Sequence, residues 1–231
     1  YHNGLSPPHI AAGKNLNMPI VGPLLRRAGA FFMRRSFQGD ALYKAVFDEY
    51  LHLMFTRGYS VEYFIEGGRS RTGRSLQPRT GMLSMTMRSF QRDASKPICF
   101  MPVYFGYEKI LEDATYLDEL SGAAKKDESI MDIFRVLGSL KNVFGKVTVN
   151  FGEPVHLHAF FDQHLANWQQ VDTVDSADFA RTCSLLANQL SQAINAAAAI
   201  NPVNLVATIL LSAPRQNIEE TRLANHVNTL I

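Results

Sequence analysis

The order of short apolar segments and longer amphipathic segments is the feature that most limits how this chain can fold. Two segments, residues 39–55 and 82–92, place apolar side chains at the three- and four-residue spacing of an α-helix. Four short apolar segments have the length and composition of buried strands, and they cover residues 28–33, 61–65, 97–105 and 147–151. Strands that alternate with helices predict an α/β fold, in which a mixed sheet is flanked by helices.

Beyond about residue 155 the pattern becomes helical. Residues 179–198 and 201–213 again carry apolar side chains at helical spacing. We therefore expect a core over residues 1–155 and a C-terminal helical segment over residues 156–231.

No stretch has the roughly 18 nearly uninterrupted apolar residues that a membrane-spanning helix requires. The nearest candidate, residues 197–213, is interrupted by two asparagines and a proline. Contact with a membrane is therefore expected at its surface. The two cysteines, Cys99 and Cys183, make no disulfide framework, which favours a reducing compartment.

Positive charge is concentrated in the first third of the chain. Residues 1–80 hold 11 Lys or Arg against 5 Asp or Glu, so their net charge is +6, whereas the whole chain carries only +2. Most of these cations are arginines, whose planar guanidinium groups grip phosphate or carboxylate with two hydrogen bonds. The distribution favours an anionic partner, such as a phosphate or an anionic lipid surface.

Residues 64–74 (FIEGGRSRTGR) form the most informative pattern, because a buried strand ends here in two glycines and a basic loop. Ligands of open α/β folds bind at the carboxyl ends of strands, and glycines let the backbone approach them closely. Exposed N–H groups and guanidinium groups at such a place suit a phosphate. The candidate binding residues are Glu66, Gly67, Gly68, Arg69, Ser70 and Arg71.

Two other functions could use this loop. Residues 68–75 differ by one residue from the nucleotide-binding pattern G-x-x-x-x-G-K-[ST], with Arg74 in place of the lysine. The loop could also belong to a non-catalytic module that binds phosphate or anionic lipid. Nucleic acid is not an expected partner, because no aromatic residues interleave with the arginines of residues 69–79.

His156 and His158 could suggest a metal site, because residues two apart on a strand share one face, and Asp162 and His164 follow. Surface histidines are the favoured interpretation, and we expect no metal.

Two further blocks carry candidate residues. Residues 29–37 (GAFFMRRSF) end a strand in Arg34 and Arg35, whose side chains point to opposite faces while the strand stays extended. Residues 102–108 (PVYFGYE) are apolar and aromatic, and they would either pack in the core or form a wall for an acyl chain.

In this order, the three blocks resemble the glycerol-3-phosphate acyltransferase family, specifically its large bacterial membrane-bound type. The resemblance implies transfer of a fatty acyl group from acyl-CoA or acyl carrier protein to the 1-hydroxyl group of glycerol 3-phosphate, which gives lysophosphatidic acid, the first step of phospholipid synthesis. It implies no metal or prosthetic group. It also implies a peripheral location on the cytoplasmic face of the inner membrane.

The resemblance further assigns roles to individual residues. Arg35 would bind the substrate phosphate, and the loop from Glu66 to Arg71 would shape the glycerol-phosphate pocket. Pro102 and Tyr104 would belong to the acyl-binding block.

The catalytic motif of this family, His-x-x-x-x-Asp, is not found in the sequence. Each of the seven histidines is followed, five residues later, by a residue other than aspartate. The family places this motif ahead of the matching blocks, so we expect it upstream of Tyr1. On this interpretation the chain is a piece of a longer protein, and it should be inactive alone.

Overall fold

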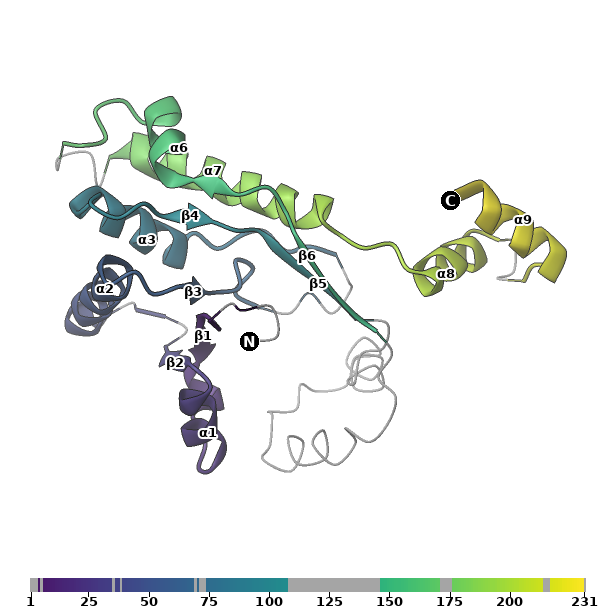
Figure 1. The fold of residues 1–231 in the computed structure, drawn as a ribbon, viewed down its shortest axis with the longest axis horizontal. Helices are drawn as coiled ribbons and strands as arrows, with labels where there is room; N and C mark the ends of the chain where they lie inside the picture. The colour runs from purple at the N-terminus through teal and green to yellow at the C-terminus, as the bar shows by residue number, and fades with distance from the viewer. Residues whose placement is uncertain are drawn as a thin grey trace.

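The computed structural model describes residues 4, 6–34, 36–37, 39–68, 70, 74–107, 146–170, 176–213 and 217–230. Figure 1 shows the arrangement: a small sheet, helices stacked to one side of it, a long ribbon of two strands, and a pair of terminal helices. The predicted α/β class is confirmed.

A three-stranded parallel sheet positions the candidate site. It consists of β1 (His9–Gly13), β2 (Ala30–Met33) and β3 (Val61–Glu62), in the order β2-β1-β3. A short 3-10 helix, η1 (Lys14–Leu16), and helix α1 (Val21–Arg27) connect β1 to β2. Helix α2 (Ala41–Thr56) connects β2 to β3.

The other strands form two antiparallel pairs. β4 (Cys99–Phe100) pairs with β7 (Val155–His156), and β5 (Val103–Tyr107) pairs with β6 (Val147–Phe151). The single strand predicted over residues 97–105 is therefore divided in two. The break falls at Met101 and Pro102, because proline has no N–H group to donate to a strand ladder.

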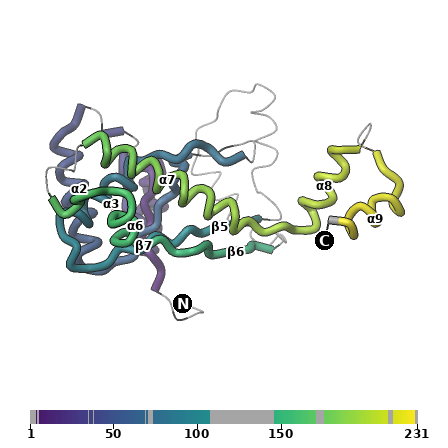
Figure 2. Tube along the Cα trace, turned by 90° about the horizontal axis from the view of Figure 1, so that it is seen from above, coloured from purple at the N-terminus to yellow at the C-terminus, as the bar shows by residue number. Residues whose placement is uncertain are grey.

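The remaining described helices are α3 (Gly81–Arg92), α6 (Leu157–His164), α7 (Ala177–Ala196), α8 (Pro202–Ser212) and α9 (Glu220–Leu230). Figures 1 and 2 both place α8 and α9 beyond the end of α7, away from the sheet and from α2 and α3. The proposed division of the chain at residue 155 stays a prediction. None of the described helices is both long enough and apolar enough to cross a bilayer.

Helix α3 lies between two hydrophobic clusters. On one side, Leu83, Met87 and Phe90 pack with residues of α6 and α7, including the fully buried Phe161 and Leu186. On the other side, Met85 packs with Phe47 and Leu51 of α2, and Phe31 and Met33 of β2 lie against that cluster. The helix thereby joins the sheet to the α6–α7 layer.

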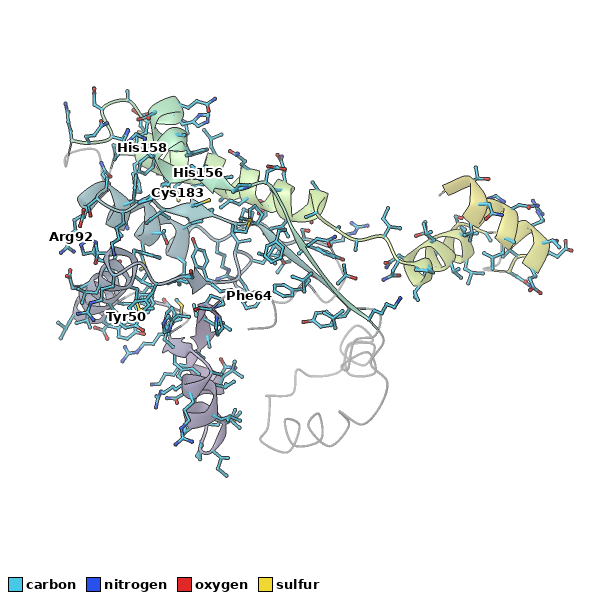
Figure 3. The ribbon with its side chains drawn as sticks, viewed as in Figure 1. Tyr50, Phe64, Arg92, His156, His158 and Cys183 are labelled. Carbon is cyan, nitrogen blue, oxygen red and sulfur yellow. The ribbon has the colours of Figure 1, made fainter. Side chains whose placement is uncertain are left out.

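Two polar contacts fix α2 against α3. The buried Nδ1 atom of His52 is hydrogen-bonded to Oγ of Ser89 at 2.9 Å. Nearer the surface, Arg92 donates to Glu49 over 2.5 Å, and this contact lowers the pKa of Glu49. Figure 3 shows Arg92 at the end of α3 that faces α2.

The two cysteines are expected to react with thiol reagents at very different rates. Cys99 lies in β4 and is exposed, although the apolar segment around it, residues 97–105, predicted a place in the core; Cys183 is 2% exposed on α7. Burial raises the pKa of the Cys183 thiol to about 11, so at about pH 8 it stays protonated and unreactive. Isotope-coded alkylation of the native whole protein, followed by peptide mass spectrometry, should label Cys99 quickly and Cys183 only after denaturation. Equal labelling rates would show that Cys183 is accessible.

Candidate functional site

The carboxyl ends of the parallel strands bring three segments of the sequence to one edge of the sheet. Lys14 follows β1, Arg34 follows β2, and the glycine-rich loop follows β3. Because β1 is the central strand, the segments that follow β2 and β3 lie on either side of the one that follows β1. Ligands of open α/β sheets bind at this edge.

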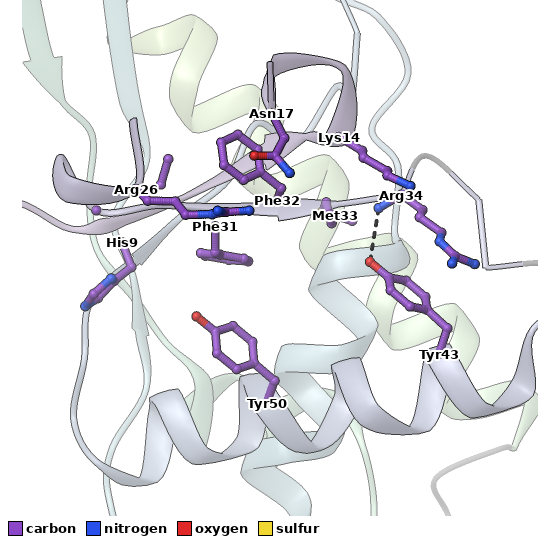
Figure 4. A pocket seen from close by; sticks show the side chains of 12 residues that line it. His9, Lys14, Asn17, Arg26, Phe31, Phe32, Met33, Arg34, Tyr43 and Tyr50 are labelled. Carbon is purple, nitrogen blue, oxygen red and sulfur yellow. Dashed lines mark hydrogen bonds between the residues drawn. The ribbon is translucent and has the colours of Figure 1, made fainter. Parts of the chain in front are cut away.

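A pocket of about 560 Å³ opens beside β1 and β2. It is formed by β1, η1, α1, β2 and α2, and Figure 4 shows it from close by. Its lining residues are His9, Lys14, Asn17, Arg26, Gly29, Ala30, Phe31, Phe32, Met33, Arg34, Tyr43 and Tyr50.

The pocket is cationic. Lys14, Arg26 and Arg34 line it, and none of its twelve lining residues is an Asp or a Glu. The guanidinium group of Arg26 lies over the ring of Phe32, 5.3 Å from its centre, which leaves the edge of the guanidinium group available for an anion.

Arg34 is held at the N-terminus of α2. Its Nη1 atom donates to Oδ2 of Asp40 over 2.6 Å, and its guanidinium group stacks on Tyr43 at 4.4 Å. Asp40 also accepts from the backbone N–H group of Tyr43, which caps α2. That backbone hydrogen bond, with the neighbouring Arg34, lowers the pKa of Asp40. Since Arg34 is already neutralised by Asp40, Lys14 and Arg26 supply most of the net positive charge of the pocket.

Aromatic side chains form the apolar part of the pocket. The ring of Tyr50 meets Phe31 edge-on at 5.5 Å, and partial burial raises the pKa of Tyr50, so its hydroxyl group stays protonated and can donate. Figure 4 shows the hydroxyl group of Tyr50 and the guanidinium group of Arg26 both directed toward the space around Phe31. Cations above aromatic rings suit a small phosphate ester whose carbon backbone lies on the rings.

The glycine-rich loop is held in a defined shape. Gly67 has a φ of +59°, and its N–H group donates to the carbonyl of Phe64 over 3.0 Å, which closes a turn. A Cβ atom on Gly67 would lie 2.8 Å from Cδ of Arg79, whose own N–H group donates to the carbonyl of Ile65. Gly67 is therefore required both for its backbone conformation and for the close approach of Arg79.

The structure describes only part of the predicted substrate-binding set. Glu66 and Ser70 are partly buried and Gly68 is exposed, and these residues belong to the loop after β3 rather than to the lining of the pocket. Arg35, Arg69 and Arg71 lie outside the described residues, so their roles stay predictions.

Pro102 directly precedes β5 and Tyr104 lies in it, within the block expected to contact an acyl chain. Pro102 is buried, and its carbonyl accepts from the N–H group of Gly152 over 2.8 Å. Tyr104 pairs with Asn150, whose side chain donates to the carbonyl of Ala197 just beyond α7. This face of the ribbon is therefore turned toward the end of α7.

Sequence reasoning missed the opposite face of the same ribbon. Its exposed apolar side chains come from alternate residues of β5 and β6: Phe105, Tyr107, Val147, Val149 and Phe151. The period-two alternation along each strand was a signal that could have found them. Lys14 and Arg26 were also missed, because the strand before Lys14 and the helix that carries Arg26 were not predicted. Tyr50 lies on a predicted helix, but nothing in the sequence indicated that it faces a pocket.

The nucleotide-binding interpretation does not fit the described residues around the loop. In that motif a helix follows the glycine-rich loop directly. Here residues 75–80 are irregular, and α3 begins only at Gly81. Ser75 is instead engaged with α7, where its hydroxyl group donates to Asn195 over 2.8 Å.

The histidine pair is not on one strand. His156 ends β7 and His158 lies in α6, where its Nδ1 atom is 3.0 Å from Asp162. The chain turns from strand to helix at Leu157, which is fully buried. Within the part of the chain that the structure describes, no group of three His, Cys, Asp or Glu residues could hold a metal ion.

Comparisons with known proteins agree with the family that the three sequence blocks resemble. A family model for the glycerol-3-phosphate acyltransferase C-terminal region matches residues 116–231, and a model described as acyltransferase matches residues 1–106. A glycerol-3-phosphate acyltransferase of Pseudomonas paraeruginosa is 60% identical over 227 residues, which cover 97% of this chain. Proteins of the same name from Pseudomonas putida and Pseudomonas fluorescens are 58% and 57% identical over 96% and 97% of the chain. The chain spans 27% of the length of these relatives.

Proposed function

Because the chain belongs to the glycerol-3-phosphate acyltransferase family, we propose that the protein containing it transfers a fatty acyl group from a thioester to the 1-hydroxyl group of glycerol 3-phosphate. The product is lysophosphatidic acid. The observation that carries the proposal is the pocket between β1, β2 and α2, which is lined by three cations and by aromatic rings but by no carboxylate.

In this proposal the pocket holds the acceptor by its phosphate. Lys14 and Arg26 bind the dianion, and the glycerol carbons lie over Phe31 with the Tyr50 hydroxyl group in reach of a glycerol oxygen. The family resemblance assigns Arg35 to the phosphate and the arginines of the glycine-rich loop to the shape of the glycerol-phosphate pocket, and in this proposal they complete the site. Binding of the remote phosphate positions the 1-hydroxyl group for attack, which lowers the entropic part of the barrier.

The reaction needs a base but no covalent acyl-enzyme. The 1-hydroxyl oxygen forms a bond to the thioester carbonyl carbon, and the carbon–sulfur bond breaks. The base removes the hydroxyl proton, which then passes to the departing thiolate. We assign the base to the histidine of the His-x-x-x-x-Asp pair expected ahead of Tyr1, with the aspartate orienting the ring.

The acyl donor is proposed to be acyl-CoA or acyl carrier protein, and no metal or prosthetic group takes part. The apolar face of the β5–β6 ribbon, with Phe105, Val149 and Phe151 exposed, offers a surface for the hydrocarbon chain. Asn150, the strand partner of Tyr104, ties that ribbon to the end of α7, and we keep Pro102 and Tyr104 in the acyl-binding block that the resemblance implies. We place the protein on the cytoplasmic face of the inner membrane as a peripheral protein.

An acyl-transfer assay on the whole protein tests the proposal. Radiolabelled glycerol 3-phosphate should be converted to lysophosphatidic acid when an acyl thioester is supplied. Binding of glycerol 3-phosphate without turnover would instead support a non-catalytic phosphate-binding module. Mg²⁺-dependent binding of a nucleotide at residues 68–75 would support the nucleotide-binding alternative.

Arg35→Ala in the whole protein should raise the KM for glycerol 3-phosphate by about 10-fold or more, because a charge-assisted hydrogen bond is worth about 1.5–3 kcal/mol. The KM for the acyl donor should change far less. The measurement is initial rate against each substrate in turn. An equal rise in both KM values would contradict the phosphate role of Arg35.

A further inference from the structure

The turn before α1 and the outer side of that helix expose large apolar side chains. Ile20 is 70% exposed and Leu24 is 60% exposed. The N–H group of Leu24 donates to the carbonyl of Ile20 over 3.4 Å, so the two residues are one helical turn apart and on the same side. The inner side is anchored, because Val21 and Gly22 are buried.

The backbone is constrained to present Ile20. Its φ is +71°, a region that a β-branched residue adopts only at a cost in free energy, so the surrounding structure must impose it. Gly22 contributes to this constraint, since a Cβ atom there would lie 2.5 Å from Oδ1 of Asn17. No packing contact within the described part of the chain explains why a strained turn holds this isoleucine in solvent.

The same element is positively charged. Arg26 and Arg27 are exposed in the last turn of α1, and Lys14 precedes it in η1. The sequence contains no Asp or Glu between residues 6 and 34. Such a segment is attracted to the negative surface of a membrane that contains anionic lipid.

The shape of the element favours a bilayer over a protein partner. In Figure 1, α1 and the turn before it extend from β1 and β2 toward the lower edge of the view, on the side away from α6 and α7. A projecting apolar tip flanked by cations matches the interface of an anionic bilayer, where the acyl chains lie beneath a layer of phosphates. The seven residues of α1 span about 10 Å, which is close to the depth that interfacial segments reach.

We propose that this projection, residues 17–27, docks the protein on an anionic lipid bilayer. Ile20 and Leu24 enter the boundary between headgroups and acyl chains, while the exposed Arg27 lies at the level of the lipid phosphates. The proposal deepens the membrane-surface location proposed above, but it does not depend on acyl transfer. It also explains why the pocket borders the projection: Asn17 and Arg26 line the pocket, so a lipid product formed there would be released next to the bilayer.

A fluorescent probe at position 24 tests the proposal directly. The whole protein, with its exposed native cysteines replaced, carries Leu24→Cys labelled with nitrobenzoxadiazole. Vesicles of phosphatidylcholine with about a third phosphatidylglycerol should shift its emission to the blue and make it accessible to a lipid-borne quencher. The matched control is the same label on Leu42→Cys, which lies on α2 and is 76% exposed; it should not respond.

The outcomes are distinct. No response at position 24 while the protein co-sediments with the vesicles would overturn the proposal. A response to acyl carrier protein alone, or to protein concentration without vesicles, would also overturn it in favour of a protein partner or a second copy of this chain.

A variant experiment gives a second measurement. Ile20→Glu with Leu24→Glu should weaken binding to the same vesicles by about 10-fold or more, whereas Leu42→Glu should change it by less than about 2-fold. Acyl transfer measured with a water-soluble short-chain donor in detergent should persist in the double variant, which separates docking from the reaction. Unchanged vesicle binding by the double variant would refute the role of the projection.

Discussion

Replacing Arg26 with alanine in the whole protein should raise the KM for glycerol 3-phosphate by about 10- to 100-fold. Arg26 lines the pocket, and its guanidinium group lies on the ring of Phe32. Loss of a charge-assisted hydrogen bond to a phosphate costs about 1.5–3 kcal/mol, and about 1.4 kcal/mol corresponds to a factor of ten. The measurement is initial rate against glycerol 3-phosphate, with a water-soluble acyl donor in detergent to remove effects of membrane docking.

Arg27→Ala is the control for this variant, because Arg27 is the next residue, carries the same charge, and is outside the lining of the pocket. Its KM should stay within about 2-fold of the unmodified protein, as is typical of an isolated surface charge. Equal effects of the two variants would mean that Arg26 acts only through the positive electrostatic potential of α1. The assignment of the pocket to glycerol 3-phosphate would then be wrong. Arg26→Lys should recover only part of the affinity, because an ammonium group lacks the two parallel N–H donors with which a planar guanidinium group binds two phosphate oxygens.

Phe161→Ala should destabilise the α3–α6–α7 layer by about 3–5 kcal/mol, the usual cost of removing a buried phenylalanine ring. Phe161 is fully buried, and its ring lies 6.0 Å from that of Phe90 and 5.3 Å from that of Trp168. Hydrogen exchange followed by mass spectrometry should show that peptides from α3 and α7 exchange faster by about 100-fold or more.

Phe64→Ala makes the same chemical change at a side chain that is 64% exposed. It should alter the exchange of those peptides by less than about 3-fold, because exposed substitutions usually change stability by less than about 0.5 kcal/mol. If Phe161→Ala left α3 and α7 as protected as Phe64→Ala does, the cluster would not be the core of this layer.

The long helices could be predicted from the sequence because their apolar periodicity extends over several turns. The helices predicted over residues 39–55, 82–92 and 179–198 correspond to α2, α3 and α7, with ends that differ by up to two residues. The strands β2 and β6 also lie where they were predicted. In each case local propensity and tertiary packing favour the same structure.

The elements that were missed are short, and their sequences give weak local signals. β1 contains Ala11, Ala12 and Gly13, residues with little preference for strands, and its position in the middle of the sheet comes from pairing with β2 and β3. The glycine and proline in α1 obscure its helical pattern, although proline is tolerated in the first turn of a helix. The pocket was missed with them, since Lys14 directly follows β1 and Arg26 lies in α1.

The part of the candidate site that could be located from the sequence is the glycine-rich loop, because its residues form one contiguous motif. The glycine-rich loop follows a strand at the carboxyl edge of the sheet, as expected, and its Gly67 has the positive φ that a bulky residue would resist. The pocket residues come instead from five separate segments. Their convergence depends on the parallel order β2-β1-β3, which local periodicity does not encode.

The position of α3 between two clusters limits how the protein can be shortened for biochemical work. A piece that ended before α6 would keep the pocket in its sequence, but it would leave Leu83, Met87 and Phe90 uncovered. Such an apolar stripe would drive self-association in water, and a loosened α3 would no longer hold the cluster on which Phe31 rests. Any binding-competent truncation should therefore extend through α7, even though no residue of α7 lines the pocket.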